Sequence, residues 1–301
     1  MVGMMLTLLF VGGVSAATRT LVDQTGRTVV VPQSPSRVIS LAPNITEIIY
    51  DLGREDRLKG VTTYNDYPAA AKALPIVGSY VRLDLEKIVS LKPDLCIAIK
   101  DGNPKETVMR LESLGIPVYA VNPRSIDTIM SSVIDIGELL NASERAGQLV
   151  KTMRTRIGRV EQRVAAANSR PRVFFQIGVS PIVSAGSDTF IHELIHKAGG
   201  VNLAGTRTSY PRYSFEEVVV LAPDIIIMTT MERENAFDEV KNRWRQWPSI
   251  PAVATGRIFI VDSDIFDRPT PRLIDALETL ARMIHPELPW DNLQKASDQC
   301  R

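Results

Sequence analysis

The stretch YVRLDLEKIVSLKPDLCIAI at residues 80–99 returns 130 residues later as YPRYSFEEVVVLAPDIIIMT at residues 210–229. The two copies align without a gap and share eight identical residues, among them Glu86 and Glu216. In both, a short helical segment ends before Pro-Asp, and a continuously apolar strand follows, as in parallel sheets buried on both faces. The duplication predicts two similar α/β lobes. Two lobes in one chain leave a cleft between them, and small ligands bind in clefts between lobes.

The first residues of each copy also predict where its helix begins. Asp84 and Ser214 are residue types that cap helix N-termini. Around both copies, strand-like and helical segments alternate, which predicts a parallel sheet covered by helices on both faces. The expected fold class is therefore α/β, with two Rossmann-like lobes.

One long amphipathic segment lies between the two copies. From Ser143 to about Ala167 apolar residues recur at helical spacing. At 1.5 Å per residue this helix is roughly 36 Å long, about the diameter of a domain. We therefore expect one long rigid helix to join the lobes. The predicted organisation is a first lobe at 18–124, a helical connector at 125–168, a second lobe at 169–290 and a polar tail at 291–301.

Composition narrows the class of function. The chain has 301 residues, 45% of them hydrophobic, which is typical of a globular protein with room for two cores. Its 35 basic and 34 acidic side chains give a formal net charge of +1. With so little net charge, no bulk field would hold the protein on nucleic acid or on an anionic membrane.

The first 17 residues have the outline of a secretory signal peptide. Residues 4–11 are mostly apolar, and small residues at 14–17 predict cleavage near Ala16 and Ala17. The apolar run is too short to span a bilayer. No Lys or Arg precedes it, so the true translation start stays open. We expect a mature protein in the periplasm, without membrane insertion.

The two cysteines do not form a disulfide framework. Cys96 lies inside the apolar strand of the first copy, whereas Cys300 is next to last in the polar tail. A buried core thiol is the favoured interpretation of Cys96. A bridge between the two in an oxidising compartment remains the alternative.

Several stretches resemble a known family. They are RVISLAP at 37–43, YNDYP at 64–68, DGN at 101–103, RVFFQIG at 172–178, SDIFDR at 263–268 and PR at 271–272. Together with the two lobes and the long helix, they resemble the extracytoplasmic solute-binding proteins of ABC importers for metal chelates, and within that group its cobalamin carriers. The resemblance implies a monomeric carrier, not an enzyme, with no cofactor and no resident metal. It would capture a corrinoid between its lobes and deliver it to a membrane permease with its ATPase. A carrier for a ferric siderophore or haem is the alternative.

The same resemblance implies a set of ligand-binding residues. They are Tyr64, Tyr80, Ile99, Tyr210, Asp264, Phe266 and Arg268. A corrin is a wide apolar disc fringed with amides, which flat rings and a few hydrogen-bonding groups suit. The cobalamin carriers have Trp where this chain has Tyr80, Ile99 and Tyr210. A corrin would then contact less aromatic ring area, so another corrinoid or another chelate remains an alternative ligand.

Glu86 and Glu216 have two interpretations. Both stand in the first turn of a predicted helix, where a carboxylate is stabilised by about 0.3–1 kcal/mol. That effect explains an acid near each helix start, but it does not require the same acid at the same site of both lobes. The family resemblance implies that these two acids meet arginines of the permease.

The motif HELIH at 192–196 raises a rival hypothesis. It fits the pattern of zinc metalloproteases, and Glu216 lies 20 residues after His196, where some of them have a third ligand. Glu216 is, however, already matched by Glu86 in a lobe without a histidine pair. We therefore expect no catalytic zinc.

Overall fold

Two separate parallel sheets form the framework of the protein. The computed structural model describes residues 17–178, 181–229 and 236–290. The first sheet has the order β4-β3-β7-β8 and the second the order β11-β9-β13-β14. Their strands are β3 (Val38–Ser40), β4 (Leu58–Gly60), β7 (Leu95–Ile99), β8 (Val118–Val121), β9 (Arg172–Gln176), β11 (Val201–Asn202), β13 (Ile225–Met228) and β14 (Ile258–Ile260). The fold class predicted from the sequence is confirmed.

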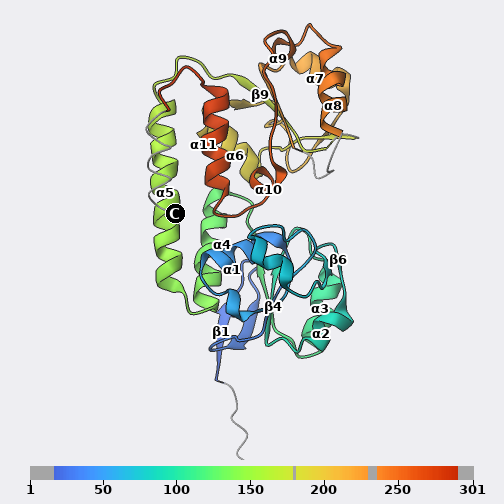
Figure 1. Ribbon diagram of the computed structural model, residues 1–301, viewed down its shortest axis with the longest axis vertical. Coiled ribbons are helices and arrows are strands. Elements are labelled where there is room, and N and C mark those ends of the chain that lie inside the picture. Colours follow the sequence, from blue (N-terminus) through green and yellow to red (C-terminus); the bar gives the residue numbers. More distant parts are fainter. Residues whose placement is uncertain (1–16, 179–180, 230–235, 291–301) are drawn as a thin grey trace, which may run out of the picture.

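Helices cover both sheets and separate their strands along the chain (Figure 1). They are α1 (Pro43–Asp51), α2 (Leu85–Ser90), α3 (Lys105–Ser113), α4 (Ile126–Leu139), α5 (Ser143–Val164), α6 (Phe190–Lys197), α7 (Phe215–Leu221), α8 (Ala236–Arg245), α9 (Pro251–Ala254), α10 (Ser263–Phe266) and α11 (Leu273–Ile284). Two short antiparallel ladders pair β5 (Gly78–Ser79) with β6 (Arg82–Leu83), and β10 (Ile182–Val183) with β12 (Arg212–Tyr213).

The repeated stretches become the same unit in each lobe. The first copy forms α2 and β7, and the second forms α7 and β13. The Asp84 carboxylate accepts a hydrogen bond from the Lys87 amide at 3.0 Å, and the Ser214 hydroxyl accepts one from the Glu217 amide at 3.2 Å. Both predicted caps are therefore confirmed. Each repeat strand is also the third strand of its sheet, flanked on both sides, which explains why it is apolar throughout.

The long helix α5 contacts helices from both halves of the chain. Its 22 residues make it about 33 Å long, and it ends three residues before the predicted end. It packs against α4, the other helix of the connector, and against α6 and α11 of the second lobe (Figure 1). Its buried stripe is Ala146, Val150, Met153, Ile157, Val160 and Val164. Arg156 adds ion pairs to Asp275 at 2.6 Å and Glu278 at 2.9 Å on α11.

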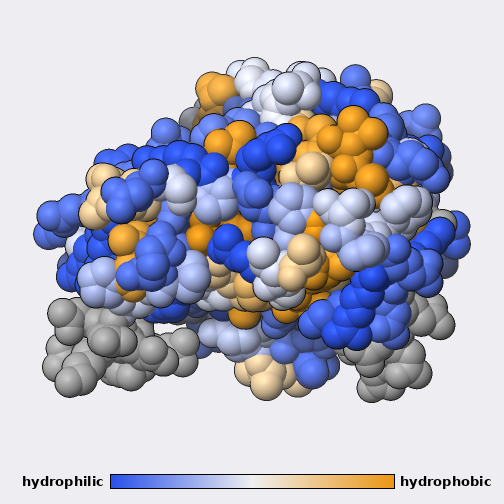
Figure 2. Space-filling model, turned by 90° about the horizontal axis from the view of Figure 1, so that it is seen from above, coloured by the Kyte–Doolittle hydropathy of each residue, from blue (hydrophilic) through white to orange (hydrophobic). Residues whose placement is uncertain are grey.

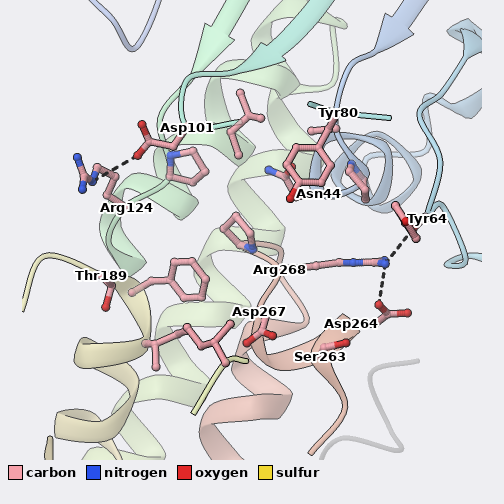
Figure 3. A pocket seen from close by; sticks show the side chains of 18 of the residues that line it. Asn44, Tyr64, Tyr80, Asp101, Arg124, Thr189, Ser263, Asp264, Asp267 and Arg268 are labelled. Atoms are coloured by element: carbon pink, nitrogen blue, oxygen red, sulfur yellow. Dashed lines mark hydrogen bonds and ion pairs between the residues drawn. The ribbon is translucent and has the colours of Figure 1, made fainter. Parts of the chain in front are cut away.

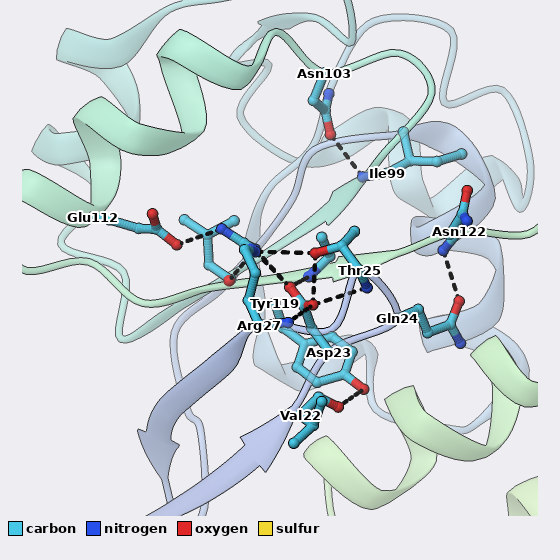
Figure 4. A network of polar contacts seen from close by, with 12 residues as sticks. Val22, Asp23, Gln24, Thr25, Arg27, Ile99, Asn103, Glu112, Tyr119 and Asn122 are labelled. Carbon is cyan, nitrogen blue, oxygen red and sulfur yellow. Dashed lines mark hydrogen bonds and ion pairs between the residues drawn. The ribbon is translucent and has the colours of Figure 1, made fainter.

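An N-terminal hairpin joins the first lobe beside β8. It pairs β1 (Thr18–Val22) with β2 (Thr28–Pro32), and the Asp23 carboxylate holds its turn by accepting from the Thr25 amide and the Arg27 guanidinium (Figure 4). In the same turn the Gln24 side-chain carbonyl accepts from the Asn122 amide at 2.6 Å. The hairpin therefore fixes the backbone immediately after β8.

The α4–α5 corner yields a stability prediction. A Cβ added at Gly137 on α4 would lie 2.5 Å from the Ala146 Cβ on α5, whereas one at Gly158 on α5 would have open space around it. We expect Gly137→Ala to lower the free energy of unfolding by about 1–3 kcal/mol through overpacking. The control Gly158→Ala should raise it by about 0.5–1 kcal/mol, because alanine favours helix. Urea unfolding followed by circular dichroism measures both changes. Equal effects of the two substitutions would contradict the close approach of these helices.

Candidate functional site

A cavity of about 650 Å³ lies where the carboxyl ends of the strands of both sheets meet. The first lobe contributes residues that follow β3, β7 and β8, and the second contributes residues that follow β9 and β14. In open parallel sheets this edge is where ligands bind, because the loops there are free to carry side chains. The location therefore marks the cavity as the candidate binding site.

The structure brings most of the predicted binding residues together at this cavity. Six of the seven line it: Tyr64, Tyr80, Ile99, Tyr210, Asp264 and Arg268. The two tyrosines that begin the repeats, Tyr80 and Tyr210, occupy the same position in the two copies. The duplicated unit thus presents one ring from each lobe to the same space.

Phe266 does not line the cavity, contrary to the expectation for it. Its side chain is only 3% exposed and its ring stacks on Phe175, with the centroids 6.4 Å apart. Helical spacing gives the reason. On α10 and its C-terminal end, residues 263, 264, 267 and 268 share the face toward the cavity, which turns Phe266 toward the core.

Arg268 connects the two walls of the cavity. Its guanidinium donates to the Tyr64 carbonyl at 2.8 Å and pairs with Asp264 at 2.7 Å (Figure 3). Tyr64 has φ of 68°, in the left-handed region that non-glycine residues rarely adopt. Such a conformation persists only when neighbours hold it, and the Arg268 hydrogen bond does so from the opposite lobe.

The arginine is itself held by a glutamate that sequence reasoning missed. Glu47 on α1 is 1% exposed, and its carboxylate accepts from Arg268 at 2.9 Å and from Arg272 at 2.8 Å. The Arg272 guanidinium lies 3.8 Å from the ring centroid of Tyr67. Burial raises the pKa of Glu47, and the two arginines oppose that rise. Glu47 therefore binds the first lobe to the segment around α10 and α11.

A second set of ion pairs crosses the cavity on its other side. Arg124, which follows β8, lies 2.9 Å from Asp188 of the second lobe and 3.7 Å from Asp101 of the first (Figure 3). The Ser209 amide donates to Asp188 and lowers the pKa of that carboxyl. Arg124 and Arg268, the arginines among the described residues that line the cavity, thus already have carboxylate partners.

Asn103 positions three segments of the cavity wall. It is nearly buried, and its side-chain amide donates to the carbonyls of Leu41 at 2.8 Å and Tyr80 at 2.7 Å. Its side-chain carbonyl accepts from the Ile99 amide at 2.8 Å (Figure 4). The only signal in the sequence was its place in the stretch DGN at 101–103, which carried the family resemblance but no stated role.

The two duplicated glutamates lie outside the cavity. Glu86 and Glu216 are exposed in the first turns of α2 and α7. Backbone N–H groups at the helix start lower the pKa of Glu216, as a helix N-terminus does for an acid. Both acids are exposed, and neither lines the cavity.

The described residues bring no third metal ligand to the histidine motif. The His192 and His196 rings lie 4.5 Å apart, but His192 Nδ1 contacts the Asn202 side chain at 3.1 Å. Glu193, which a protease would use as its base, accepts from the Ile126 amide at 2.7 Å at the start of α4. Within the described ranges no group of three His, Cys, Asp or Glu could hold a metal ion, so Glu216 is not brought to the histidines. The zinc-protease hypothesis lacks its third ligand.

Some sequence predictions fall on residues outside the described ranges. They are the signal peptide and its cleavage site up to residue 16, the tail at 291–301 and the partner cysteine, Cys300. Cys96 lies buried in β7, where burial raises the pKa of its thiol to about 12. In the part of the chain that the structure describes, no helix is both long and apolar enough to cross a membrane.

Comparison with known proteins extends over nearly the whole chain. The family model described as "Periplasmic binding protein" matches residues 38–265. The vitamin B12-binding protein of Yersinia pestis is 32% identical over 253 residues, which cover 84% of this chain and 87% of that protein. The solved structure of the periplasmic vitamin B12 binding protein BtuF of Vibrio cholerae has a TM-score of 0.75 at 31% identity, covering 84% and 98% of the two chains. The periplasmic heme-binding protein RhuT of Roseiflexus has the same TM-score at 26% identity, covering 83% and 98%.

The Glu47 contacts predict a large stability effect. Glu47→Gln removes the negative charge that compensates the mostly buried guanidinium groups of Arg268 and Arg272. Breaking a buried ion pair in this way costs about 3–5 kcal/mol. Chemical unfolding of the ligand-free protein should show a loss of this size. Glu138→Gln, at an exposed acid on α4, is the matched control and should change stability little. Equal stability of both variants would show that the Glu47 contacts do not hold the lobes.

Proposed function

The chain belongs to the periplasmic binding protein family, the substrate-binding components of ABC importers, and we propose that its ligand is a corrinoid such as cobalamin. Members of this family bind a small molecule and present it to a membrane permease with its ATPase, and they are not enzymes. The ligand is cargo, so no cofactor is needed.

The observation that supports a corrinoid is the combination of rings and sparse polar groups in the cavity. Tyr64, Tyr80 and Tyr210 reach it from both lobes, and Ile99 adds an apolar surface. A wide, flat ligand can lie against such rings while a few polar groups fix its edge. The two relatives compared at 31–32% identity are named for vitamin B12, which agrees with this assignment.

A haem or a ferric siderophore is the second candidate ligand. A haem-binding protein shares the fold at 26% identity. Haem and the anionic siderophores carry negatively charged groups that bind free cations. Arg124 and Arg268, however, are already paired with carboxylates within the cavity, which favours the corrinoid.

We further propose that the protein works as a monomer in the periplasm after cleavage near Ala16 and Ala17. Residues 18–124 and 169–290 would act as the two lobes, and residues 125–168 as the connector. The packing of α4 on α1 and of α5 on α6 and α11 supports this division, because the connector then touches both lobes.

Glu86 and Glu216 are proposed to bind arginines of the permease. They occupy equivalent repeat positions, and α2 and α7 lie on the side of the molecule away from α5, one in each lobe (Figure 1). Exposed apolar side chains stand beside them: Val89 on α2 is 41% exposed and Val220 on α7 is 84% exposed. Seen from the end of the second lobe, hydrophobic residues gather in patches among hydrophilic ones (Figure 2). Acids beside small apolar patches suit a partner surface with a charged and an apolar part.

The ligand assignment is tested by calorimetry with cobalamin. We expect one cobalamin per protein, and Tyr80→Ala and Tyr210→Ala should each weaken binding by about 1–3 kcal/mol because ring contact is lost. Tyr80→Phe keeps the ring and is the matched control, with affinity close to the wild type. If cobalamin and its nucleotide-free form cobinamide give no heat while haem or a ferric siderophore binds, the corrinoid assignment is wrong.

The docking proposal predicts a loss of complex formation without a loss of ligand binding. Glu86→Lys combined with Glu216→Lys should abolish binding to the permease in nanodiscs, because like charges then face its arginines. Cobalamin affinity should stay unchanged, since both acids lie outside the cavity. The control is Asp127→Lys with Glu144→Lys, two first-turn acids on α4 and α5. Undiminished complex formation by the Glu86/Glu216 variant would leave both acids as helix-end residues only.

A further inference from the structure

Three residues of the cavity wall carry buried polar atoms without a hydrogen-bond partner. Within the described ranges these atoms are Asn44 Nδ2, Asn122 Oδ1 and both carboxylate oxygens of Asp267. Burying a polar atom without a partner costs free energy, so native proteins rarely keep such atoms without a reason. Seven other buried side-chain atoms of the described residues also lack a partner, but only these four belong to residues that line the cavity, where a ligand can supply partners.

The unpartnered groups reach the cavity from both lobes. Asn44 is 3% exposed and lies in the first turn of α1, and Asn122 directly follows β8. Asp267 lies at the end of α10 in the second lobe. The side chains of Asn44 and Asp267 both point into the space between the lobes (Figure 3). A ligand held there would meet a donor and an acceptor on one wall and a carboxyl group on the other.

Among the described residues, Arg268 is a cation near Asp267, but its charge lowers the pKa of Asp267 less than burial raises it. Arg268 lies beside it in sequence, but its guanidinium pairs with Glu47 and Asp264. Burial, together with the nearby acids Asp264 and Asp262, raises the pKa of Asp267 to about 7. The Thr229 hydroxyl is close enough to lower the pKa, yet no hydrogen bond of acceptable geometry joins the two groups. A ligand with its own negative charge would therefore meet repulsion here.

We propose that Asn44, Asn122 and Asp267 bind carboxamide groups on the edge of the ligand, and that Asp267 selects against carboxylates. The inference deepens the corrinoid assignment above and rests on it. A primary carboxamide has both an acceptor oxygen and two donor hydrogens. Asn44 Nδ2 donates to such an oxygen, and Asn122 Oδ1 accepts from such an N–H.

Asp267 suits a carboxamide in either protonation state. As a carboxylate it accepts from the amide N–H, and as a carboxylic acid it donates to the amide oxygen. A ligand carboxylate has no hydrogen to donate to Asn122 or to ionised Asp267, and it repels the latter. The three groups thus distinguish a neutral carboxamide edge from an anionic one of the same shape.

Two corrinoids of opposite edge chemistry test the inference. Cobinamide carries carboxamide side chains, and cobyrinic acid carries carboxylates on the same ring. Calorimetry at pH 8, where Asp267 is mostly ionised, should show the wild type binding cobinamide at least tenfold more tightly than cobyrinic acid. Asp267→Asn should reduce that preference about tenfold, chiefly by improved binding of cobyrinic acid.

Control variants separate selection from general damage. Asp127→Asn removes the charge of an exposed acid in the first turn of α4 that does not line the cavity, and should leave the preference within about threefold of the wild type. Asn44→Asp adds a carboxylate on the opposite wall and should strengthen the preference for cobinamide. Circular dichroism and thermal melting confirm that each variant is folded before its ligands are compared.

The outcomes distinguish this inference from the proposed function. If the wild type binds both corrinoids equally, or if folded Asp267→Asn keeps the full preference, the carboxamide inference is overturned while the corrinoid assignment stands. If neither corrinoid binds the wild type and haem does, the proposed function fails instead. The expected pattern in both Asp267→Asn and Asn44→Asp supports the inference.

Discussion

The carboxylate of Glu47 is the contact on which the arrangement of the cavity depends. It is buried on α1, yet both of its partners, Arg268 and Arg272, come from the C-terminal part of the chain. A carboxylate removed from water is stable only when its charge is compensated at close range. Because Arg268 serves Glu47, it stands where it also reaches the Tyr64 carbonyl and Asp264. One buried acid of the first lobe therefore determines where the cavity residues around Arg268 in the second lobe lie.

The duplication gives each lobe an inner and an outer surface with separate tasks. Each copy begins with a tyrosine at the cavity, Tyr80 or Tyr210, and six positions later presents an exposed acid, Glu86 or Glu216. The strand that follows is in the interior of its sheet and ties the two surfaces to the core. A single helix–strand unit thus supplies a ring for the cavity and a charge for the exterior. Because the unit is repeated, each lobe has one tyrosine at the cavity and one exposed glutamate outside it.

Local patterns in the sequence predicted the units of the fold, and distant contacts escaped them. Periodicity along α5 and the apolar repeat strands sufficed for the two lobes and their connector, because those signals lie within one segment. Glu47 gave no such signal, since its partner Arg268 is 221 residues away. The prediction placed Phe266 at the cavity, because a resemblance identifies only the segment of sequence that holds the binding residues. Which face of the four-residue helix α10 each side chain takes depends on packing, and Phe266 packs on Phe175 in the core. The N-terminal hairpin was also missed. Its strands alternate exposed residues with partly or fully buried ones, so only one face of the hairpin is buried.

The division of the strands between the sheets has a consequence for the order of folding. Every strand of the first sheet lies between residues 38 and 121, and every strand of the second between residues 172 and 260. As the chain lengthens from its N-terminus, the first sheet can close before the second has been made, as is usual for domains that fold as units. Glu47, however, has neither arginine until residues 268 and 272 arrive. A chain truncated before residue 268 would keep an uncompensated carboxylate in its first lobe, so the segment that leads into the last helix also commits the earliest part of the molecule to its final state.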